Sequence, residues 1–343
     1  MAGLLQSEPV VLHLKHHLKG DDANAFGIAL ALADRLGGRV VSLECGLRTT
    51  ALVPVVRAML RRRRGGAAGR DLSAGMRWWS VLFDGEKPPV GPVSAVVSTL
   101  GRGETPAAYI SSYWGVPAIH LGSPKRMTQR ELAIILTHQG QSPNPGEIVL
   151  PISPTRIVRR AAKPVRKDLV LVLAGGDAEG ISYSEPFWSN LIGHANAVAQ
   201  SMAQGLAVIT SPRTGDAEKH IEATARDLGL PQECLVLYGR PAKRAYPELL
   251  SAAAVVFVTA ESVSMISDAV AAGAKVVAVH QGELPRSDRI RRFIGEQLSY
   301  RHIGLLDLSQ PDPASDFSNI EPLESCWSDL FWEQVRSHFV STK

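Results

Sequence analysis

Residues 255–273 read VVFVTAESVSMISDAVAAG, and this stretch predicts a buried strand, a polar turn and a helix in direct succession. The apolar run ends at Thr259, a helix is expected to begin near Ser262, and Gly273 would end it. A strand that passes at once into a helix is the repeating unit of parallel α/β sheets. The stretch therefore predicts an α/β protein.

The same alternation continues along the chain in both directions. In the second half, apolar runs predict further strands at residues 168–174, 206–210, 234–238 and 275–280. In the first half, they predict a helix over 25–36 and strands at residues 9–14, 39–43, 93–99, 117–121, 132–137 and 147–150. We therefore predict two Rossmann-like, doubly wound lobes that face a shared cleft.

A proline-rich, basic segment separates the two halves. Residues 151–164 contain three prolines, which interrupt both the strand and the helix patterns. The chain has 343 residues, which is enough for two domains. We expect an N-terminal lobe over residues 1–160, a C-terminal lobe over 161–320, and a helix over 321–343 that packs across the two lobes.

The composition excludes several classes of protein. With 45% hydrophobic and 20% charged residues, the chain can bury a core and is not intrinsically disordered. A formal net charge of +4 is too small to predict a nucleic-acid partner. Three cysteines, far apart in the sequence, fit a reducing compartment, and no apolar run approaches the roughly 20 residues of a spanning helix. We expect a cytoplasmic protein, or one peripheral to the inner membrane.

The polar turn in the opening stretch is the strongest candidate binding site. The N-terminus of a helix has unpaired N–H groups and partial positive charge, so it suits a phosphate. Thr259, Glu261, Ser262 and Ser264 lie at this turn, and Asp268, one turn further on, could accept hydrogen bonds from ribose hydroxyls. The same residues could instead only cap the helix.

Other predicted strands of the second half end in polar groups that would lie at the same edge of the sheet. Arg213, held by a Pro/Gly turn, suits a phosphate, although a solvated surface arginine would look the same. The full set expected to bind a nucleotide-linked donor comprises Gly175, Gly176, Ser211, Arg213, Thr214, Arg240, Thr259, Glu261, Ser262, Ser264 and Asp268.

Groups that could act on an acceptor follow strands of the first half. Asp22, and after it His17 or His138, could take a proton from an acceptor hydroxyl. Asp22 could also be a helix cap, and His138 a structural turn residue. We expect the acceptor side to include Lys19, Gly20, Asn24, Lys125 and Arg126. No Asp-x-Asp or other metal-ligand spacing occurs, so we expect neither a metal nor a cofactor.

An arginine run and a tryptophan pair allow a second kind of contact. Arg61 to Arg64 and Trp78-Trp79 could bind anionic headgroups at a membrane surface. A solvated charge run with two core tryptophans is the alternative.

The strand-end segments together resemble the mitochondrial-fission ELM-type family, whose bacterial members are often described as glycosyltransferases. The segments that carry the resemblance are residues 19–24, 120–126, 137–140, 173–176, 210–214 and, most specifically, 259–268. The resemblance covers most of residues 10–300. It implies a GT-B-type fold, with the donor bound by the C-terminal lobe and the acceptor by the N-terminal lobe.

The sequence thus predicts a metal-independent glycosyltransferase. It would move a sugar from a nucleotide-sugar donor to an envelope or glycan acceptor, which includes lipid-linked glycans. Two alternatives remain open: a non-catalytic interaction protein of the same family, and a nucleotide-sugar epimerase.

Overall fold

The chain forms two compact units, Met1–Val158 with Trp327–Lys343, and Arg159–Cys326. The computed structural model describes residues 8–17, 19–64, 71–89, 91–137, 141, 143–158, 167–178, 180–310 and 317–340. The domain bounds expected from the sequence, 1–160 and 161–320, stay a prediction.

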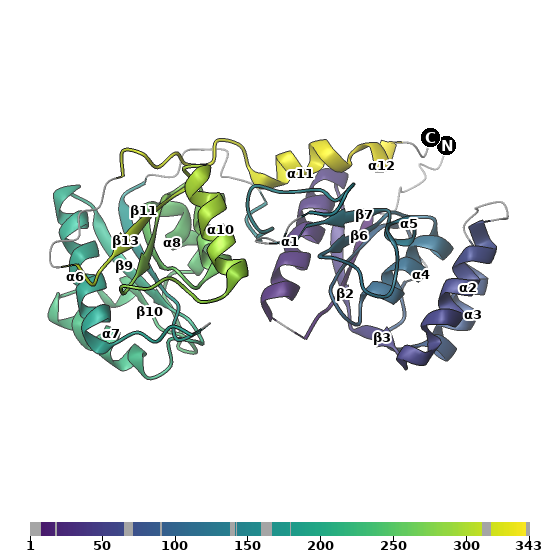
Figure 1. The fold of residues 1–343 in the computed structure, drawn as a ribbon, viewed down its shortest axis with the longest axis horizontal. Helices are drawn as coiled ribbons and strands as arrows, with labels where there is room; N and C mark the ends of the chain where they lie inside the picture. The colour runs from purple at the N-terminus through teal and green to yellow at the C-terminus, as the bar shows by residue number, and fades with distance from the viewer. Residues whose placement is uncertain are drawn as a thin grey trace, which may run out of the picture. The chain divides into compact units, whose positions relative to one another are not determined.

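The N-terminal unit is built on a five-stranded parallel sheet with the order β2-β1-β5-β6-β7 (Figure 1). Its strands are β1 (Val10–Leu14), β2 (Arg39–Leu43), β5 (Val93–Thr99), β6 (Ala118–Leu121) and β7 (Ile134–Leu136), and β3 (Cys45–Leu47) pairs with β4 (Phe83–Gly85) in a separate antiparallel ribbon. Its helices are α1 (Lys19–Leu36), α2 (Val53–Arg64), α3 (Leu72–Leu82), α4 (Glu104–Trp114), α5 (Gln129–Leu132), α11 (Trp327–Val335) and α12 (Ser337–Val340), with a 3₁₀ turn at Thr50–Leu52.

The C-terminal unit has a six-stranded parallel sheet with the order β10-β9-β8-β11-β12-β13. Its strands are β8 (Leu169–Ala174), β9 (Gly205–Thr210), β10 (Leu235–Val236), β11 (Ala253–Thr259), β12 (Lys275–His280) and β13 (Ile303–Asp307). Its helices are α6 (Glu185–Ser201), α7 (Ala217–Asp227), α8 (Tyr246–Ala252), α9 (Val263–Ala271) and α10 (Asp288–Ser299), with a 3₁₀ turn at Gln232–Cys234. Numbered within the unit, the strand order is 3-2-1-4-5-6, that of the dinucleotide-binding folds.

The central strands are apolar because helices cover both faces of a parallel sheet. All six residues of β8 are buried, as are six of the seven in β11. In the N-terminal unit, an aromatic cluster of Trp79, Phe83, Tyr109 and Tyr113 packs α3 against α4. The predicted fold class, two doubly wound α/β lobes, is confirmed.

Some predicted boundaries were wrong. Helix α1 begins at Lys19 rather than Ala25, since Asp21 and Asp22 in its first turn favour the helix N-terminus. Residues 147–150 form only an isolated bridge between Leu136 and Ile148, and residues 234–238 form a strand of two residues. Strand β13 was not predicted, because Gly304 interrupts its short apolar run.

The C-terminal helix α11 belongs to the N-terminal unit, where it packs against α1. Trp327 is fully buried, its indole N–H donates to the carbonyl of Ile157 at 2.8 Å, and Asp329 forms an ion pair with Arg35 of α1. The predicted packing of this helix across both lobes stays a prediction. Among the described residues, no helix is long and apolar enough to span a membrane.

Replacing Trp327 with Ala should lower the free energy of unfolding of the N-terminal unit by about 3–5 kcal/mol, the cost of emptying a large buried aromatic site. Urea denaturation, fitted with one transition per unit, measures the change. Glu333→Ala, an exposed position on the same helix, is the control and should stay within about 0.5 kcal/mol of the parent. Equal effects of the two substitutions would contradict the prediction that burial of Trp327 on α11 stabilises the N-terminal unit.

Candidate functional site

The site of the C-terminal unit lies where the strand order of its sheet reverses. Strands β8 and β11 are hydrogen-bonded neighbours at the centre of the sheet, and they are the first and fourth strands of the unit in sequence. Open α/β sheets bind ligands beyond the carboxyl ends of the strands at this switch point. Here the chain places Gly175-Gly176 after β8 and Glu261-Ser262 after β11.

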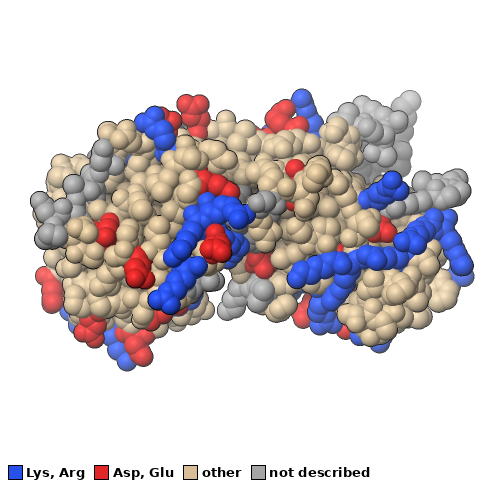
Figure 2. All heavy atoms as spheres, viewed as in Figure 1, with Lys and Arg blue, Asp and Glu red and all other residues tan. Residues whose placement is uncertain are grey.

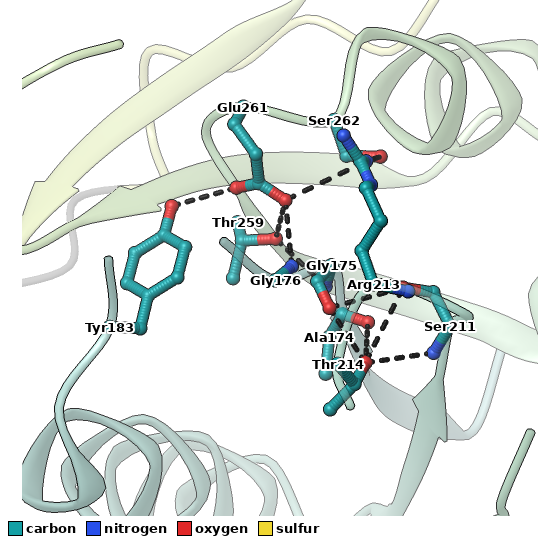
Figure 3. Close-up of polar contacts among 10 residues, drawn as sticks. All are labelled: Ala174, Gly175, Gly176, Tyr183, Ser211, Arg213, Thr214, Thr259, Glu261 and Ser262. Carbon is teal, nitrogen blue, oxygen red and sulfur yellow. Dashed lines mark hydrogen bonds and ion pairs between the residues drawn. The ribbon is translucent and has the colours of Figure 1, made fainter. Parts of the chain in front are cut away.

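The carboxylate of Glu261 organises this edge, and its side chain has no exposed surface (Figure 3). One oxygen accepts the backbone N–H of Gly176 at 3.0 Å and the hydroxyl of Thr259 at 3.0 Å, and the other accepts the Tyr183 hydroxyl at 2.7 Å. Burial, together with the neighbouring Glu261 charge, raises the pKa of Tyr183, so this phenol stays a donor. A buried carboxylate is stable only with such partners, so Glu261 is a fixed part of the framework.

The two glycines are required by close packing at this point. The N–H of Gly175 donates to Thr259 Oγ1 at 2.9 Å, and a Cβ atom on Gly175 would overlap the Glu261 carboxylate. A Cβ atom on Gly176 would overlap the backbone carbonyl of Arg213. Both backbone N–H groups therefore donate to side chains of the protein itself.

Hydroxyl groups from the end of β9 close the third side of the site (Figure 3). Thr214 Oγ1 donates toward the carbonyl of Ala174 at 2.9 Å and that of Gly175 at 2.6 Å, and the Ser211 hydroxyl donates to the Gly175 carbonyl at 3.0 Å. Both side chains are buried, and their hydrogen bonds hold the loop after β8 in place. Their predicted contact with a nucleotide-linked donor stays a prediction.

Arg213 is the exposed group of this cluster. Its guanidinium donates to Ser262 Oγ at 2.9 Å and lies 3.7 Å from Glu261 Oε1, while 41% of its side chain stays exposed. Ser262 is the N-cap residue of α9. The cation is thus held beside the N-terminus of a helix, and the two features attract anions at the same place.

The remaining residues predicted to bind the sugar donor make other contacts in the structure. Ser264 is exposed in the first turn of α9, and Asp268 accepts a hydrogen bond from Tyr246 at 3.0 Å. Arg240 instead contacts α7, 3.0 Å from Glu222 and 3.6 Å from Glu218. Those two carboxylates already balance its charge.

The corresponding edge of the N-terminal unit places Asp22 against a buried histidine. Asp22 Oδ1 accepts the backbone N–H of His16 at 2.7 Å and lies 3.3 Å from Nε2 of His13. His13 is 1% exposed and its Nδ1 lies 3.1 Å from Ser42 Oγ. Burial lowers the pKa of His13 more than Asp22 raises it. Residues 19–24, predicted to precede the first helix, are the beginning of α1: Gly20 is exposed and Asn24 half-buried, and the Lys19 side chain lies outside the described residues.

A second buried carboxylate fixes the predicted acceptor loop. Glu104, 1% exposed, accepts the backbone N–H groups of Lys125 at 3.2 Å, Arg126 at 2.6 Å and Met127. The Arg126 side chain donates to the carbonyl of Gly101 at 3.1 Å, while the Lys125 side chain is exposed.

A cavity of about 600 Å³ opens at this edge of the N-terminal unit. His17 lines it, and the other lining residues include Lys15, His16, Glu44, Asp84 and Arg102. Of the three predicted bases, His17 is exposed at the cavity, Asp22 is engaged by His13 and His16, and His138 lies outside the described residues. Within the part of the chain that the structure describes, no group of three His, Cys, Asp or Glu residues is placed to bind a metal ion.

The structure brings further polar groups to these edges that were not predicted as site residues. His13 and His120 stand inside apolar strand runs, and Glu104 lies more than 20 residues before the loop that it contacts. The only signal in the sequence was the polar residue within an otherwise apolar strand. His120 is fully buried, its Nδ1 lies 2.9 Å from Ser98 Oγ, and burial lowers its pKa to about 3.

Comparisons with known proteins find one family and a set of similar structures. Residues 20–303 match the model of the family described as Mitochondrial fission ELM1. The sequence matches no curated protein.

Similar solved structures include MurG of Acinetobacter baumannii, at 15% identity over 96% of this chain and 92% of that chain, with a TM-score of 0.40. The E. coli heptosyltransferase WaaC, with ADP-2-deoxy-2-fluoro heptose, is similar at 10% identity over 96% and 99% of the two chains, with a TM-score of 0.40. Phytolacca americana UGT2, with UDP-2fluoro-glucose and pterostilbene, is similar at 9% identity over 96% and 93%, with a TM-score of 0.42.

Replacing Tyr183 with Phe should lower the free energy of unfolding of the C-terminal unit by about 1.5–3 kcal/mol, because a hydrogen bond to a buried charge is lost. Tyr300→Phe changes an exposed phenol by the same atom and is the matched control, expected to be neutral. Urea denaturation of both variants measures the difference. A neutral Tyr183→Phe would show that Glu261 does not depend on this donor.

His120 should make the N-terminal unit less stable in acid. Its pKa is lower folded than unfolded, so the unfolded chain binds the extra proton, and stability is lost as pH falls from about 6.5 toward 3. The expected slope from this residue is about 1.4 kcal/mol per pH unit within that window. Denaturation at several pH values should show a shallower slope for His120→Gln than for the parent. Parallel slopes would refute this assignment.

Proposed function

The chain belongs to the mitochondrial fission ELM1 family, and from the switch point of its C-terminal unit we propose that it transfers a sugar from a nucleotide-linked donor. The observation that carries the proposal is the position of Arg213, partly exposed and hydrogen-bonded to the N-cap residue of α9. A planar guanidinium beside a helix N-terminus suits the diphosphate that links nucleoside to sugar.

The same two groups would assist the chemistry. When the bond from the sugar to the diphosphate breaks, negative charge develops on the leaving phosphate. Donors that already point at this position stabilise that charge without reorganising, and such electrostatic effects are often the largest part of catalysis. Glu261 lies 3.7 Å from the guanidinium of Arg213, which donates to Ser262. These two contacts hold the cation in place before the sugar donor binds.

A deprotonating group would come from the N-terminal unit. His17 is exposed at the 600 Å³ cavity, where its ring could take the proton of an acceptor hydroxyl. Asp22 could act as this base only through Oδ2, because Oδ1 already accepts the His16 N–H. The acceptor in this proposal is a glycan, free or linked to a lipid, and no metal takes part.

A non-catalytic interaction protein is the second candidate, and one observation favours it. The N–H groups of Gly175 and Gly176, which would face a phosphate in a nucleotide-binding loop, donate to Thr259 and Glu261. A loop that satisfies its own donors holds its shape without a ligand. Such a unit can keep the fold for contacts with other proteins alone.

Titration with a panel of nucleoside diphosphates and nucleotide-sugars, always with a chelator present, tests the proposal. Arg213→Ala should cost about 1.5–3 kcal/mol of binding, and Ser264→Ala about 0.5–1.5 kcal/mol, because the helix N–H groups remain. Arg213→Lys keeps the charge beside Glu261 but loses the fork, so we expect an intermediate loss.

Arg226→Ala is the control, since this exposed arginine of α7 pairs with Glu222 and should not affect binding. Product analysis then separates transfer from epimerisation. If the native chain binds no nucleotide, the interaction candidate takes precedence. Binding that appears only after metal is restored would contradict metal independence.

A further inference from the structure

Helices α2 and α3 of the N-terminal unit have a composition unlike the rest of the chain. Their sequences, VPVVRAMLRRRR and LSAGMRWWSVL, contain six arginines and no carboxylate. Asp71, the N-cap residue of α3, forms an ion pair with Arg63 at 3.5 Å. The two helices therefore carry a strong excess of positive charge.

The same helices expose apolar side chains beside these arginines. Val55 on α2 is 47% exposed, and Trp78 and Val81 on α3 are 46% and 55% exposed. Trp79, the neighbour of Trp78, is 1% exposed within the aromatic cluster. Trp79 therefore lies in the core and Trp78 at the surface, whereas each alternative considered from the sequence placed both tryptophans together, either at a membrane surface or in the core.

The arrangement follows from the helical period. The inner faces of both helices pack against α4 through residues that include Val56, Leu60 and Trp79. The outer face of α2 presents Val55, Ala58, Arg61 and Arg62, at intervals of three and four residues. The outer face of α3 presents Arg77, Trp78 and Val81 in the same way. Figure 2 shows a band of Lys and Arg side chains that crosses the N-terminal unit and reaches the edge where α2 and α3 lie in Figure 1.

We propose that the outer faces of α2 and α3, defined by Val55, Arg61, Arg62, Arg77, Trp78 and Val81, form a docking surface for a bilayer that contains anionic lipid. Arginines would contact the headgroup phosphates, while the indole and the two valines enter the interface between headgroups and acyl chains. Tryptophan favours that depth because its ring is amphipathic.

The apolar residues decide between a bilayer and a nucleic acid. Arginines alone would suit either polyanion, and an indole can stack on a base. Exposed valines gain nothing from a phosphate backbone, but they gain free energy when an interfacial helix buries them. The absence of carboxylates from both helices removes the repulsion that an anionic surface would otherwise meet.

Co-sedimentation with vesicles tests the surface. The full chain should bind vesicles of phosphatidylcholine with about 30% phosphatidylglycerol, bind poorly to phosphatidylcholine alone, and weaken as salt rises. Arg61→Gln/Arg62→Gln should lower the partition coefficient by roughly thirtyfold, from about fivefold per lost charge. Trp78→Ser should lower it by about fivefold, in proportion to the apolar area that is no longer buried.

A matched control has the same charge change elsewhere. Lys219→Gln/Arg226→Gln removes two exposed cations from α7 of the C-terminal unit and should leave vesicle binding unchanged. Lipids brominated on the acyl chains should quench the tryptophan fluorescence of the parent, and should quench that of Trp78→Phe clearly less. This difference would place residue 78 at the boundary of the acyl chains.

Three results would overturn the proposal. The first is equal binding to neutral and anionic vesicles, and the second is equal loss in the α7 control. The third is binding to double-stranded DNA as tight as to anionic vesicles, with the same dependence on Arg61 and Arg62 and none on Trp78. That outcome would identify a site for polyanions in general.

Discussion

The burial of one carboxylate, Glu261, governs the geometry of the C-terminal edge. Its two oxygens hold Gly176, Thr259 and Tyr183, and its charge lies 3.7 Å from Arg213. These partners come from the ends of β8, β9 and β11 and from the segment before α6, so one anion fixes the relative positions of four segments. Because a buried charge without partners is strongly destabilising, the segments and the carboxylate are stable only together.

In the N-terminal unit, the buried carboxylate of Glu104 fixes a loop as Glu261 does in the C-terminal unit. Glu104 follows β5, a central strand of its sheet, and accepts three successive backbone N–H groups from the loop after β6. Both units thus use an acidic side chain from one strand end to fix the loop of a neighbouring strand. The contacts of the two carboxylates differ. Glu261 lies beside the guanidinium of Arg213, whereas Glu104 accepts backbone N–H groups.

The sequence predicted the sheets well because buried parallel strands read as continuous apolar runs. The bounds of β2, β5 and β12 coincide with the predicted ranges, and α9 begins at Val263, next to the predicted start near Ser262. The contacts of the site could not be predicted in the same way. Residue types showed that Glu261 and Arg213 lie at strand ends, but the inward direction of the carboxylate depends on Tyr183, 78 residues away. Likewise, His13 looked like one more residue of a buried strand, and only the register of β1 and β2 places it beside Ser42.

The packing of Gly175 against Glu261 has a consequence for how this family can diverge. A methyl group at position 175 has no space while a glutamate side chain occupies the position above it. A shorter residue at 261 would remove the nearest obstacle, but the Thr259 hydroxyl would still lie too close to a Cβ atom, and the change would also release Tyr183 and the Gly176 N–H. Positions 175, 259 and 261 are therefore linked: a substitution at one changes which substitutions the others tolerate, although 84 residues separate Gly175 from Thr259 along the chain. Descendant sequences should reach a new arrangement of this edge by paired replacement, through an intermediate that is less stable than either end state.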